Sequence, residues 1–440
     1  MNQSSTSVRI AQVGVVALLI AAPFHAFLTV WGASLVGNYT LLRLWSAIVL
    51  GVLSVIGVYW LARDPSFRST FMSTLFVRLI LAYALLTVAW AGLGVVMFDV
   101  SPRAAVTGLL LNLRFLAFFL LAWATAQYSP WLVQNWRKLV LIPGGVVAAF
   151  AVAQYLILPS DFLRHFGYGP GTIDPYETIN NNPNYLRFSS FLRGPNPLGA
   201  YMLVILTSVV ALWDKRAKQR FLVSLTAVLS LCALLISFSR SAWIGALVSV
   251  GLVLAVRYRS ALTKQRVLVA CAIATALFAL LFVVANNNRF VQNAIFHTDD
   301  SSVVKTSSND ARSSALSTGA VAVLTNPIGG GVGSAGPASV QGDGPVQLAE
   351  NYFVQIGQET GWLGLGLFVA IIFVVAKSLW QNRSSTLALA CFASLIGLVV
   401  VNMLSHAWAD DTLAFTWWGI AGMALAGSQK VGHEANTSNR

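Results

Sequence analysis

Hydrophobic positions dominate this chain and fall into long runs separated by short polar segments. Each run is long enough to cross a hydrocarbon core of about 30 Å, which takes roughly 20 helical residues. The pattern therefore predicts an all-α polytopic membrane protein with about twelve transmembrane helices. The predicted spans are 10–31, 40–62, 76–98, 104–127, 139–158, 197–213, 220–238, 241–256, 267–285, 353–376, 386–405 and 412–427.

Two polar segments are much longer than the other connections. Loops of this length within a compact bundle are usually functional or disordered, and we expect the larger one to form a partly helical lid. The predicted organisation is N-terminal helices in 1–158, a first outer loop in 159–196, central helices in 197–285, a large outer loop in 286–350, C-terminal helices in 351–427 and a polar tail in 428–440.

The positions of the basic residues predict the orientation, because Lys and Arg favour cytoplasmic loops. Placing both termini in the cytoplasm puts more than half of the 28 basic residues on that side and both long loops on the outer face. The net charge of +13 then reflects topology and attraction to anionic membrane lipid. Nucleic-acid binding would need a soluble basic domain, and the sequence shows none.

Three arginines are the first candidates for chemistry, and all fall on the predicted outer face. Arg193 precedes the helix expected from Pro197, Arg240 lies in a very short turn between two helices, and Arg312 lies in the large loop. Guanidinium groups bind phosphate oxygens in a bidentate manner. Together they predict a site for a lipid-linked diphosphate, although each alone also fits an interfacial side chain or a salt bridge.

Glu350 is the candidate general base. It directly precedes the helix expected from Asn351, and partial desolvation there would raise its pKa enough for it to accept a proton. The alternative is a solvated charge that complements the helix dipole. His165, His297 and His406 are fallback bases.

Arg43 and Arg114 fall inside predicted spans, where charge is costly and is usually functional or paired. Glu359 is the one acidic residue within the spans that offers an obvious partner for Arg114. The segment Asn326–Gly333 fits either an anion-binding backbone nest or a flexible turn. It lacks the Gly-Lys-Ser/Thr ending of a nucleotide-binding loop.

The remaining polar groups support no metal site. The spacing of His297, Asp299 and Asp300 matches no strong ligand pattern. Cysteines 232, 271 and 391 fall within spans, where we expect them to behave as small apolar residues. The Asn-, Tyr- and Arg-rich sequence of the first outer loop fits sugar binding or a turn-rich connector equally well.

Several segments taken together resemble the O-antigen ligase and polymerase family of bacterial membrane glycosyltransferases. The resemblance covers about residues 190 to 370 and depends on their order and shared outer location. The segments are Arg193–Gly199, Phe238–Trp243, Arg312 with Asn326–Gly331, and Glu350–Gln355 with Glu359–Gly364.

The resemblance implies a transferase at the periplasmic face of the bacterial inner membrane, where an acceptor hydroxyl attacks an undecaprenyl-diphosphate-linked glycan and the diphosphate leaves. It implies no cofactor or metal. The acceptor would be a glycan or lipid A–core, and polysaccharide-assembly proteins are further partners. By this resemblance Glu350 is the catalytic base, Arg193, Arg240 and Arg312 bind the diphosphate, and Asn351, Asn196 and Ser239 support them.

One departure bears on the choice within the family. Ligases of lipid A–core typically carry histidine before the asparagine, whereas this chain has Glu350 before Asn351. The departure favours a polymerase of surface polysaccharide repeat units. The alternatives are a ligase that transfers glycan to lipid A–core or protein, a polysaccharide transporter or flippase with midplane polar residues or broken helices, and a structural scaffold.

Overall fold

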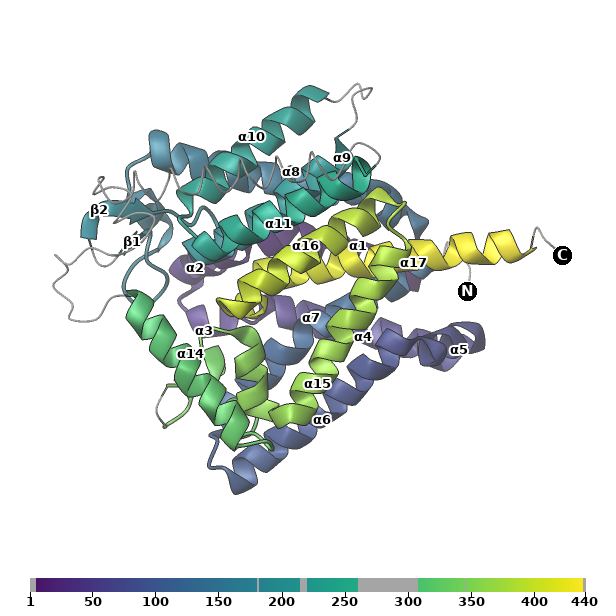
Figure 1. Ribbon diagram of the computed structural model, residues 1–440, viewed down its shortest axis with the longest axis horizontal. Coiled ribbons are helices and arrows are strands. Elements are labelled where there is room, and N and C mark those ends of the chain that lie inside the picture. Colours follow the sequence, from purple (N-terminus) through teal and green to yellow (C-terminus); the bar gives the residue numbers. More distant parts are fainter. Residues whose placement is uncertain (1–4, 180–181, 214–219, 260–307, 345, 438–440) are drawn as a thin grey trace.

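The apolar runs fold into long helices in the computed structural model of the chain, which describes residues 5–179, 182–213, 220–259, 308–344 and 346–437 (Figure 1). The helices are α1 Thr6–Ala21, α2 His25–Val36, α3 Tyr39–Leu42, α4 Trp45–Arg63, α5 Pro65–Ser73, α6 Leu75–Met97, α7 Pro102–Tyr128, α8 Pro130–Leu156, α9 Pro195–Leu212, α10 Arg220–Ile236, α11 Arg240–Arg257, α14 Ser308–Thr325, α15 Tyr352–Gln381, α16 Thr386–Met403 and α17 Asp411–Thr437. Short 3-10 turns are η1 Ala22–Phe24, η2 Phe162–Phe166, η4 Gly336–Gln341 and η5 Ala407–Ala409, and the strands are β1 Glu177–Ile179 and β2 Asn182–Arg187.

The predicted class of an all-α polytopic membrane protein is confirmed. Within the described ranges, nine helical segments are long and apolar enough to cross a membrane. Helices α10 and α17 cover two further predicted spans. The predicted span 267–285 lies outside the described residues, so the total of about twelve stays a prediction.

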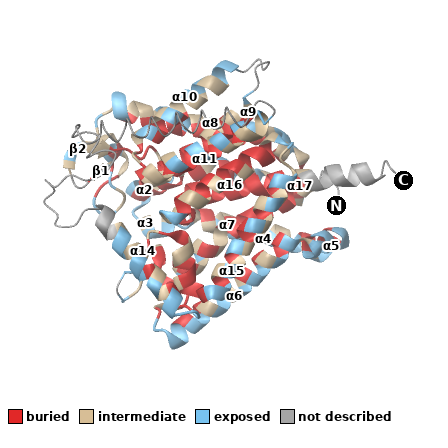
Figure 2. Cartoon of the chain, viewed as in Figure 1, coloured by how far each residue is buried: buried red, intermediate tan, exposed pale blue. Residues whose placement is uncertain are grey.

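Helix α7 lies in the interior of the bundle and packs along α17. Phe115, Phe118, Phe119 and Trp123 on α7 are fully buried, in the part of the bundle where Figure 2 shows the most buried residues. The outer helices α4 and α6 instead expose many valines and leucines, such as Leu85 at 74%. Exposed apolar side chains in this pattern fit contact with lipid rather than water.

Small residues let two of the inner helices approach closely. A Cβ built on Gly397 of α16 would lie 2.3 Å from the carbonyl oxygen of Gly245 on α11. Close backbone contact at glycine is a common way for helices to associate in membranes, where packing replaces the hydrophobic driving force.

The first predicted span is not one straight helix. A 3-10 turn at Pro23 separates α1 from α2, because proline cannot donate the backbone hydrogen bond that a continuous helix needs. The prediction for Arg43 was also wrong in part. Arg43 follows the short helix α3 and precedes α4, so it lies outside the membrane-spanning segment rather than within it.

The two predicted outer loops contain ordered elements. In the first, β1 and β2 form a small antiparallel hairpin that pairs Glu177 with Arg187. In the second, α14 packs against α15, and η4 packs against α7. The larger predicted loop therefore contains a helix, α14, whereas the expectation that it acts as a lid stays a prediction.

Helix α15 is broken at Gly361, which has φ 66° and ψ −166°. The glycine-rich segment after α14 satisfies backbone groups around this break. The N–H of Gly330 donates to Gln358 O at 2.7 Å, and Trp362 N–H donates to Pro327 O at 2.9 Å. A break in a membrane helix is tolerated where buried protein groups satisfy the freed backbone in this way.

The same glycine-rich segment also binds the side chain of Glu359. This side chain is fully buried and accepts a hydrogen bond from Gly333 N–H at 2.9 Å and one from Asn112 Nδ2 at 2.7 Å. The N–H groups of Gly330 and Gly331 instead donate to the backbone carbonyls of Gln358 and Glu359, so a backbone nest for an external anion stays a prediction.

The alternation of the helices brings the starts of α9, α11, α15 and α17 to one end of the bundle. Figure 1 shows β1, β2 and α14 at that end, on the left, whereas both chain termini and α5 lie on the right. Among the described residues, Arg193, Arg240, Arg312 and Glu350 of the predicted outer face therefore lie toward one end of the bundle.

We predict that Gly361→Ala destabilises the protein by about 2–3 kcal/mol, because the backbone conformation is one that essentially only glycine adopts. A Cβ there would also lie 2.2 Å from Pro327 O. Gly366→Ala on the same helix is the matched control, since a Cβ at Gly366 meets nothing within 4 Å. The measurement is the thermal unfolding midpoint in detergent, and equal midpoints for both variants would contradict the prediction.

Candidate functional site

Residues from several separate elements line one cavity at the end of the bundle that carries the β hairpin and α14, and we call it the Glu350 cavity. Its volume is about 230 Å³. It joins β1, the start of α9, helix α14, the segment before α15 and the turn between α16 and α17. The lining residues are Glu177, Arg193, Gly194, Asn196, Pro197, Arg312, Glu350, Ser405, His406, Ala407, Ala409 and Asp410.

A buried arginine, Arg187 on β2, fastens the hairpin to the helices beside this cavity. Its Nε and Nη2 donate to Ser237 O at 3.0 and 2.9 Å, and Nη2 also donates to Asn196 Oδ1 at 2.7 Å. Its Nη1 lies 3.7 Å from Glu177 Oε2. Burial lowers the pKa of Arg187 to about 10, with Glu177 opposing the shift, so the side chain stays cationic at neutral pH.

The sequence analysis did not identify Arg187 as a candidate. Its role in fastening the hairpin could not be predicted, because its pairing with Glu177 depends on the register of β1 and β2. By contrast, the sequence did identify Asn196, which lines the cavity and accepts the hydrogen bond from Arg187. Asn196 therefore supports the site as a contact between the hairpin and α9.

The very short turn predicted around Arg240 is confirmed, with α10 ending at Ile236 and α11 starting at Arg240. Phe238 within it has a left-handed φ of 48°. Gly199 packs against the turn so closely that a Cβ would lie 2.8 Å from Ser237 Oγ. Ser239 is buried and its hydroxyl lies 3.4 Å from that of Ser241.

This packing changes the roles expected for Ser239 and Arg240. Neither residue is among those that line the Glu350 cavity. Arg240 instead lies close enough to interact electrostatically with Arg312 and with Arg187. Its positive charge therefore adds to the positive potential at Arg312, which lines the cavity.

Glu350 is held by the residue that follows it. Asn351 caps α15 by accepting a hydrogen bond from Val354 N–H at 3.0 Å, and its Nδ2 donates to Met403 O at 2.8 Å. Glu350 itself has a left-handed φ of 50°, a conformation that costs a non-glycine residue about 1 kcal/mol or more. The predicted supporting role of Asn351 thus takes the form of a cap that ties α15 to α16.

The turn between α16 and α17 adds two titratable groups to the cavity. Burial lowers the pKa of His406, as do Arg193 and Arg312, while Glu350 opposes them. Burial raises the pKa of Asp410, as does Asp411. His406 is therefore a neutral imidazole at neutral pH, in the same cavity as Glu350. Of the fallback bases, His165 is exposed on η2 and lies outside the cavity.

Arg193 and Arg312 are the cations that face the cavity directly. Arg193 is exposed and Arg312 is half-buried. Within the described ranges, neither side chain forms a hydrogen bond or an ion pair with the protein. Glu177 lies in the electrostatic field of both, and Asp410 lies in that of Arg193. Two guanidinium groups without a bonded partner at the same cavity are suited to an anionic ligand.

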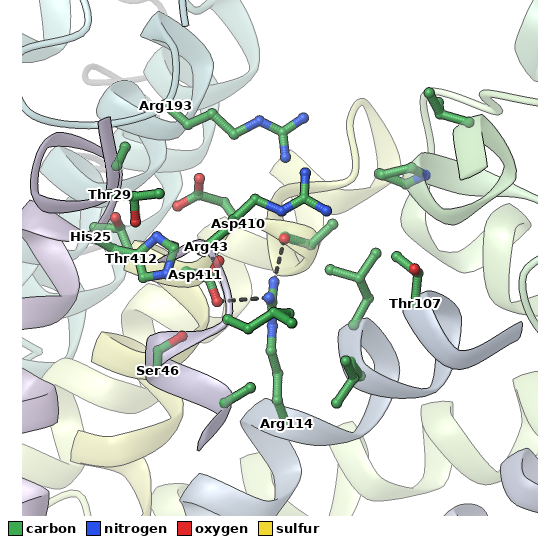
Figure 3. A pocket seen from close by; sticks show the side chains of 18 of the residues that line it. His25, Thr29, Arg43, Ser46, Thr107, Arg114, Arg193, Asp410, Asp411 and Thr412 are labelled. Carbon is green, nitrogen blue, oxygen red and sulfur yellow. Dashed lines mark hydrogen bonds and ion pairs between the residues drawn. The ribbon is translucent and has the colours of Figure 1, made fainter. Parts of the chain in front are cut away.

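Arg114 has a different partner from the one that the sequence indicated. Its Nη1 lies 2.7 Å from Asp411 Oδ1, and its Nη2 donates to Ala409 O at 2.6 Å (Figure 3). Glu359 is not the partner, because its carboxylate is bonded to Asn112 and Gly333. Arg114 therefore neutralises Asp411 and holds the turn that carries His406 and Asp410.

The metal candidates His297, Asp299 and Asp300 lie outside the described residues, as does Cys271. In the part of the chain that the structure describes, no group of three or more His, Cys, Asp or Glu side chains is placed to share a metal ion. Cys232 and Cys391 are free thiols.

Residues 225–369 match the family model described as O-antigen ligase. The matched range contains the Arg240 turn, Arg312, Glu350 and the broken segment of α15, whereas Arg193 and Asn196 precede it. The match supports the O-antigen ligase/polymerase family, and with it a function of the ligase or polymerase type and a glycosyltransferase-like enzyme. No curated protein matches the chain.

We predict that Arg187→Gln destabilises the protein by about 2–3 kcal/mol, because it removes hydrogen bonds from a buried charged group and leaves Ser237 O and Asn196 Oδ1 without this donor. The control is Arg164→Gln, whose ion pair with Asp161 is 61% and 50% exposed and should matter by less than about 1 kcal/mol. Thermal unfolding of the purified proteins tests this. Equal midpoints would show that Arg187 does not fasten the hairpin.

Proposed function

We propose that this chain is a membrane glycosyltransferase that transfers a glycan from undecaprenyl diphosphate to an acceptor hydroxyl in the Glu350 cavity. The observation that carries the proposal is the composition of that cavity. It brings a carboxylate, a neutral imidazole and two guanidinium groups without bonded partners together at one end of a membrane bundle.

The reaction needs a base and a stabilised leaving group, and the cavity offers both. Glu350 removes the proton of the acceptor hydroxyl as its oxygen attacks the anomeric carbon. The bond between that carbon and the diphosphate oxygen breaks, and the diphosphate leaves with the electron pair. Arg193 and Arg312 neutralise the charge that develops on the diphosphate, an effect that is usually a large part of catalysis. Arg240, which interacts electrostatically with Arg312, adds to the positive potential there.

Glu350 is the proposed base because its backbone is fixed beside the two arginines while its side chain remains partly exposed. His406 is the second group in the cavity able to take up a proton, since its imidazole is neutral. Asn351 and Asn196 position this arrangement, and Ser239 packs the turn that carries Arg240. The lipid diphosphate supplies the leaving group, so the proposal includes no metal or cofactor.

We assign the cavity to the periplasmic face of a bacterial inner membrane, with both termini in the cytoplasm. The support is the position of the site at one end of the bundle and of the termini, with the basic residues near α5, at the other (Figure 1). Membrane lipid surrounds the exposed apolar faces, and polysaccharide-assembly proteins are proposed partners.

We further propose that the acceptor is the glycan of a second lipid-linked repeat unit, which makes the enzyme a polymerase. The support is Glu350 at the position where ligases of lipid A–core typically carry histidine. A ligase transferring to lipid A–core or protein is the alternative that shares this cavity. A transport path is less well supported, because the broken helix α15 is satisfied by the glycine-rich segment and Arg114 is paired with Asp411.

We predict that Glu350→Gln lowers the transfer rate by about 10²–10⁴-fold, the usual contribution of a general base, and that Arg312→Ala also causes a severe loss. Each variant is expressed in a deletion strain, and its surface glycan is separated on a gel. Single-repeat products indicate a lost polymerase, whereas accumulated lipid-linked polymer without capped lipid A–core indicates a lost ligase.

The control for this experiment is Arg103→Ala, because Arg103 is an exposed arginine near the same end of the bundle that does not line the cavity. It should leave the glycan ladder unchanged. Normal ladders from Glu350→Gln and Arg312→Ala, at normal protein levels, would refute the catalytic assignment.

The pH dependence follows from His406. Burial lowers its pKa in the folded protein, so its protonation, which would remove the second group in the cavity able to take up a proton, requires a pH below the ordinary histidine value of about 6.5. We predict a transfer rate that is constant above that pH and falls below it. Initial rates in vitro test this, and a fall centred above pH 6.5 that disappears in His406→Asn would contradict it.

A further inference from the structure

The turn between α16 and α17 is joined to the segment that carries Glu350. His406 on this turn and Glu350 line the same cavity. The N–H of Tyr352, two residues after Glu350, donates to the carbonyl of Ser405, directly before His406, at 3.2 Å. The side chain of Asn351 makes a second link to the start of the turn at 2.8 Å. The two hydrogen bonds therefore hold the backbones of Glu350 and His406 next to each other, although 56 positions separate the two residues in the chain.

The turn that carries His406 is itself fixed by buried contacts. Asn402 is fully buried, and its Oδ1 accepts a hydrogen bond from Trp408 N–H at 3.0 Å across the turn. The carbonyl of His406 accepts one from Ala409 N–H at 3.0 Å. Arg114 then donates to the carbonyl of Ala409 at 2.6 Å. The protein thus sets the position of His406 in advance, as proton transfer between positioned groups requires.

Charges from three separate segments act on His406. Burial lowers the pKa of His406, Glu350 raises it, and Arg193 and Arg312 lower it. The imidazole is therefore neutral at neutral pH, and it lies close enough to Glu350 to interact with its carboxylate. The other titratable or permanently charged groups that share a cavity with His406 are Glu177 and Asp410 on one side, and His25, Arg43, Arg114 and Asp411 on the other.

A neutral imidazole complements the weak basicity of a carboxylate. A base works best when its pKa lies near the operating pH. The ordinary pKa of glutamate is about 4.3 and that of histidine about 6.5. A proton that Glu350 takes from a hydroxyl therefore has a more favourable position on the imidazole of His406 than on Glu350 itself.

We propose that Glu350 and His406 act as one proton-transfer pair, in which Glu350 takes the proton of the acceptor hydroxyl and passes it to a ring nitrogen of His406. The inference rests on the proposed function and adds a second proton acceptor to it. As the O–H bond of the acceptor breaks, its electron pair forms the bond to the anomeric carbon, and the diphosphate leaves with the pair of the broken bond. The carboxyl O–H bond of Glu350 then breaks as an N–H bond forms on His406. Glu350 returns to a carboxylate, and water later takes the proton from the imidazolium.

The diphosphate in the same cavity controls when His406 accepts the proton. Arg193 and Arg312 oppose a positive charge on His406 as long as they have no ligand. A diphosphate bound between them neutralises both cations, so it raises the pKa of His406 toward the ordinary value, whereas burial still lowers it. The imidazole therefore stays neutral in the free enzyme and becomes a better proton acceptor once the leaving group is in place.

The first test measures the protonation of His406 without measuring transfer. Diethyl pyrocarbonate modifies neutral imidazole, and peptide mass analysis of the purified full-length protein gives the pH midpoint at His406. Glu350→Gln should lower this midpoint, because it removes a negative charge, and Arg312→Ala should raise it. Inorganic pyrophosphate should raise the midpoint of the wild type, and by less in Arg312→Ala. His165, which is exposed on η2 outside the cavity, is the internal control and should not shift.

A His406 midpoint that neither Glu350→Gln nor pyrophosphate changes overturns the pairing. The pyrophosphate measurement uses the wild-type protein, so it decides the matter even where a variant is poorly folded. Equal shifts at His165 and His406 would show a general effect of charge on the protein and would also overturn the pairing.

The second test is a double-mutant cycle on the transfer rate at neutral pH. His406→Asn should lower the rate by about 10²-fold, the lower end of the usual contribution of a proton-transfer group. Because both residues act on the same proton, Glu350→Gln with His406→Asn should be no slower than Glu350→Gln alone. Losses that multiply would show independent roles and overturn the relay, as would a wild-type rate for His406→Asn. Arg103→Ala is the control and should keep the wild-type rate.

The failure of this proposal differs from the failure of the proposed function. Transfer lost in Glu350→Gln but normal in His406→Asn, with an unmoved His406 midpoint, overturns the relay and leaves Glu350 as the base. Normal transfer by both Glu350→Gln and Arg312→Ala refutes the proposed function, and the relay that rests on it is then overturned as well.

Discussion

The buried side chain of Glu359 is the constraint on which the end of the bundle with the Glu350 cavity depends. A carboxyl group removed from water must be met by hydrogen bonds, and here Asn112 of α7 and the N–H of Gly333 supply them at 2.7 and 2.9 Å. The segment that carries Gly333 follows α14 directly, and Glu359 itself lies in the first part of α15. The two hydrogen bonds of Glu359 therefore hold α15 and the segment after α14 against the central helix α7. Arg312 lies on α14, and Glu350 lies just before α15.

The arginines at this end of the bundle divide into two classes by their partners. Arg187 is buried, Arg114 is largely buried, and each is bonded and fastens a loop to the helices: the β hairpin in the first case and the α16–α17 turn in the second. Arg193 and Arg312 face the Glu350 cavity, and in the described part of the chain their side chains have no bonded partner. The paired arginines determine where the cavity walls lie, so the others can keep their charge available to a ligand without being neutralised by the protein.

The sequence predicts those features that depend on local pattern. Apolar runs predicted the helices, and the very short turn at Arg240 predicted that α10 and α11 meet there. The sequence did not show that Arg187 pairs with Glu177, because that pairing depends on strand register. Nor did it show that Arg114 pairs with Asp411 rather than Glu359, or that His406 lies beside Glu350. These contacts join residues distant in the chain, and hydrophobic periodicity carries no information about them.

The proposed function divides the residues of the Glu350 cavity between donor and acceptor. Arg193 and Arg312 bind the diphosphate of the donor in that proposal, and Glu350 accepts the proton of the acceptor hydroxyl. A polymerase and a ligase of this kind would use the same donor and differ in the acceptor. Glu177 of the β hairpin lines the same cavity and is not assigned to the donor, so the residues that distinguish the two activities are expected on the hairpin.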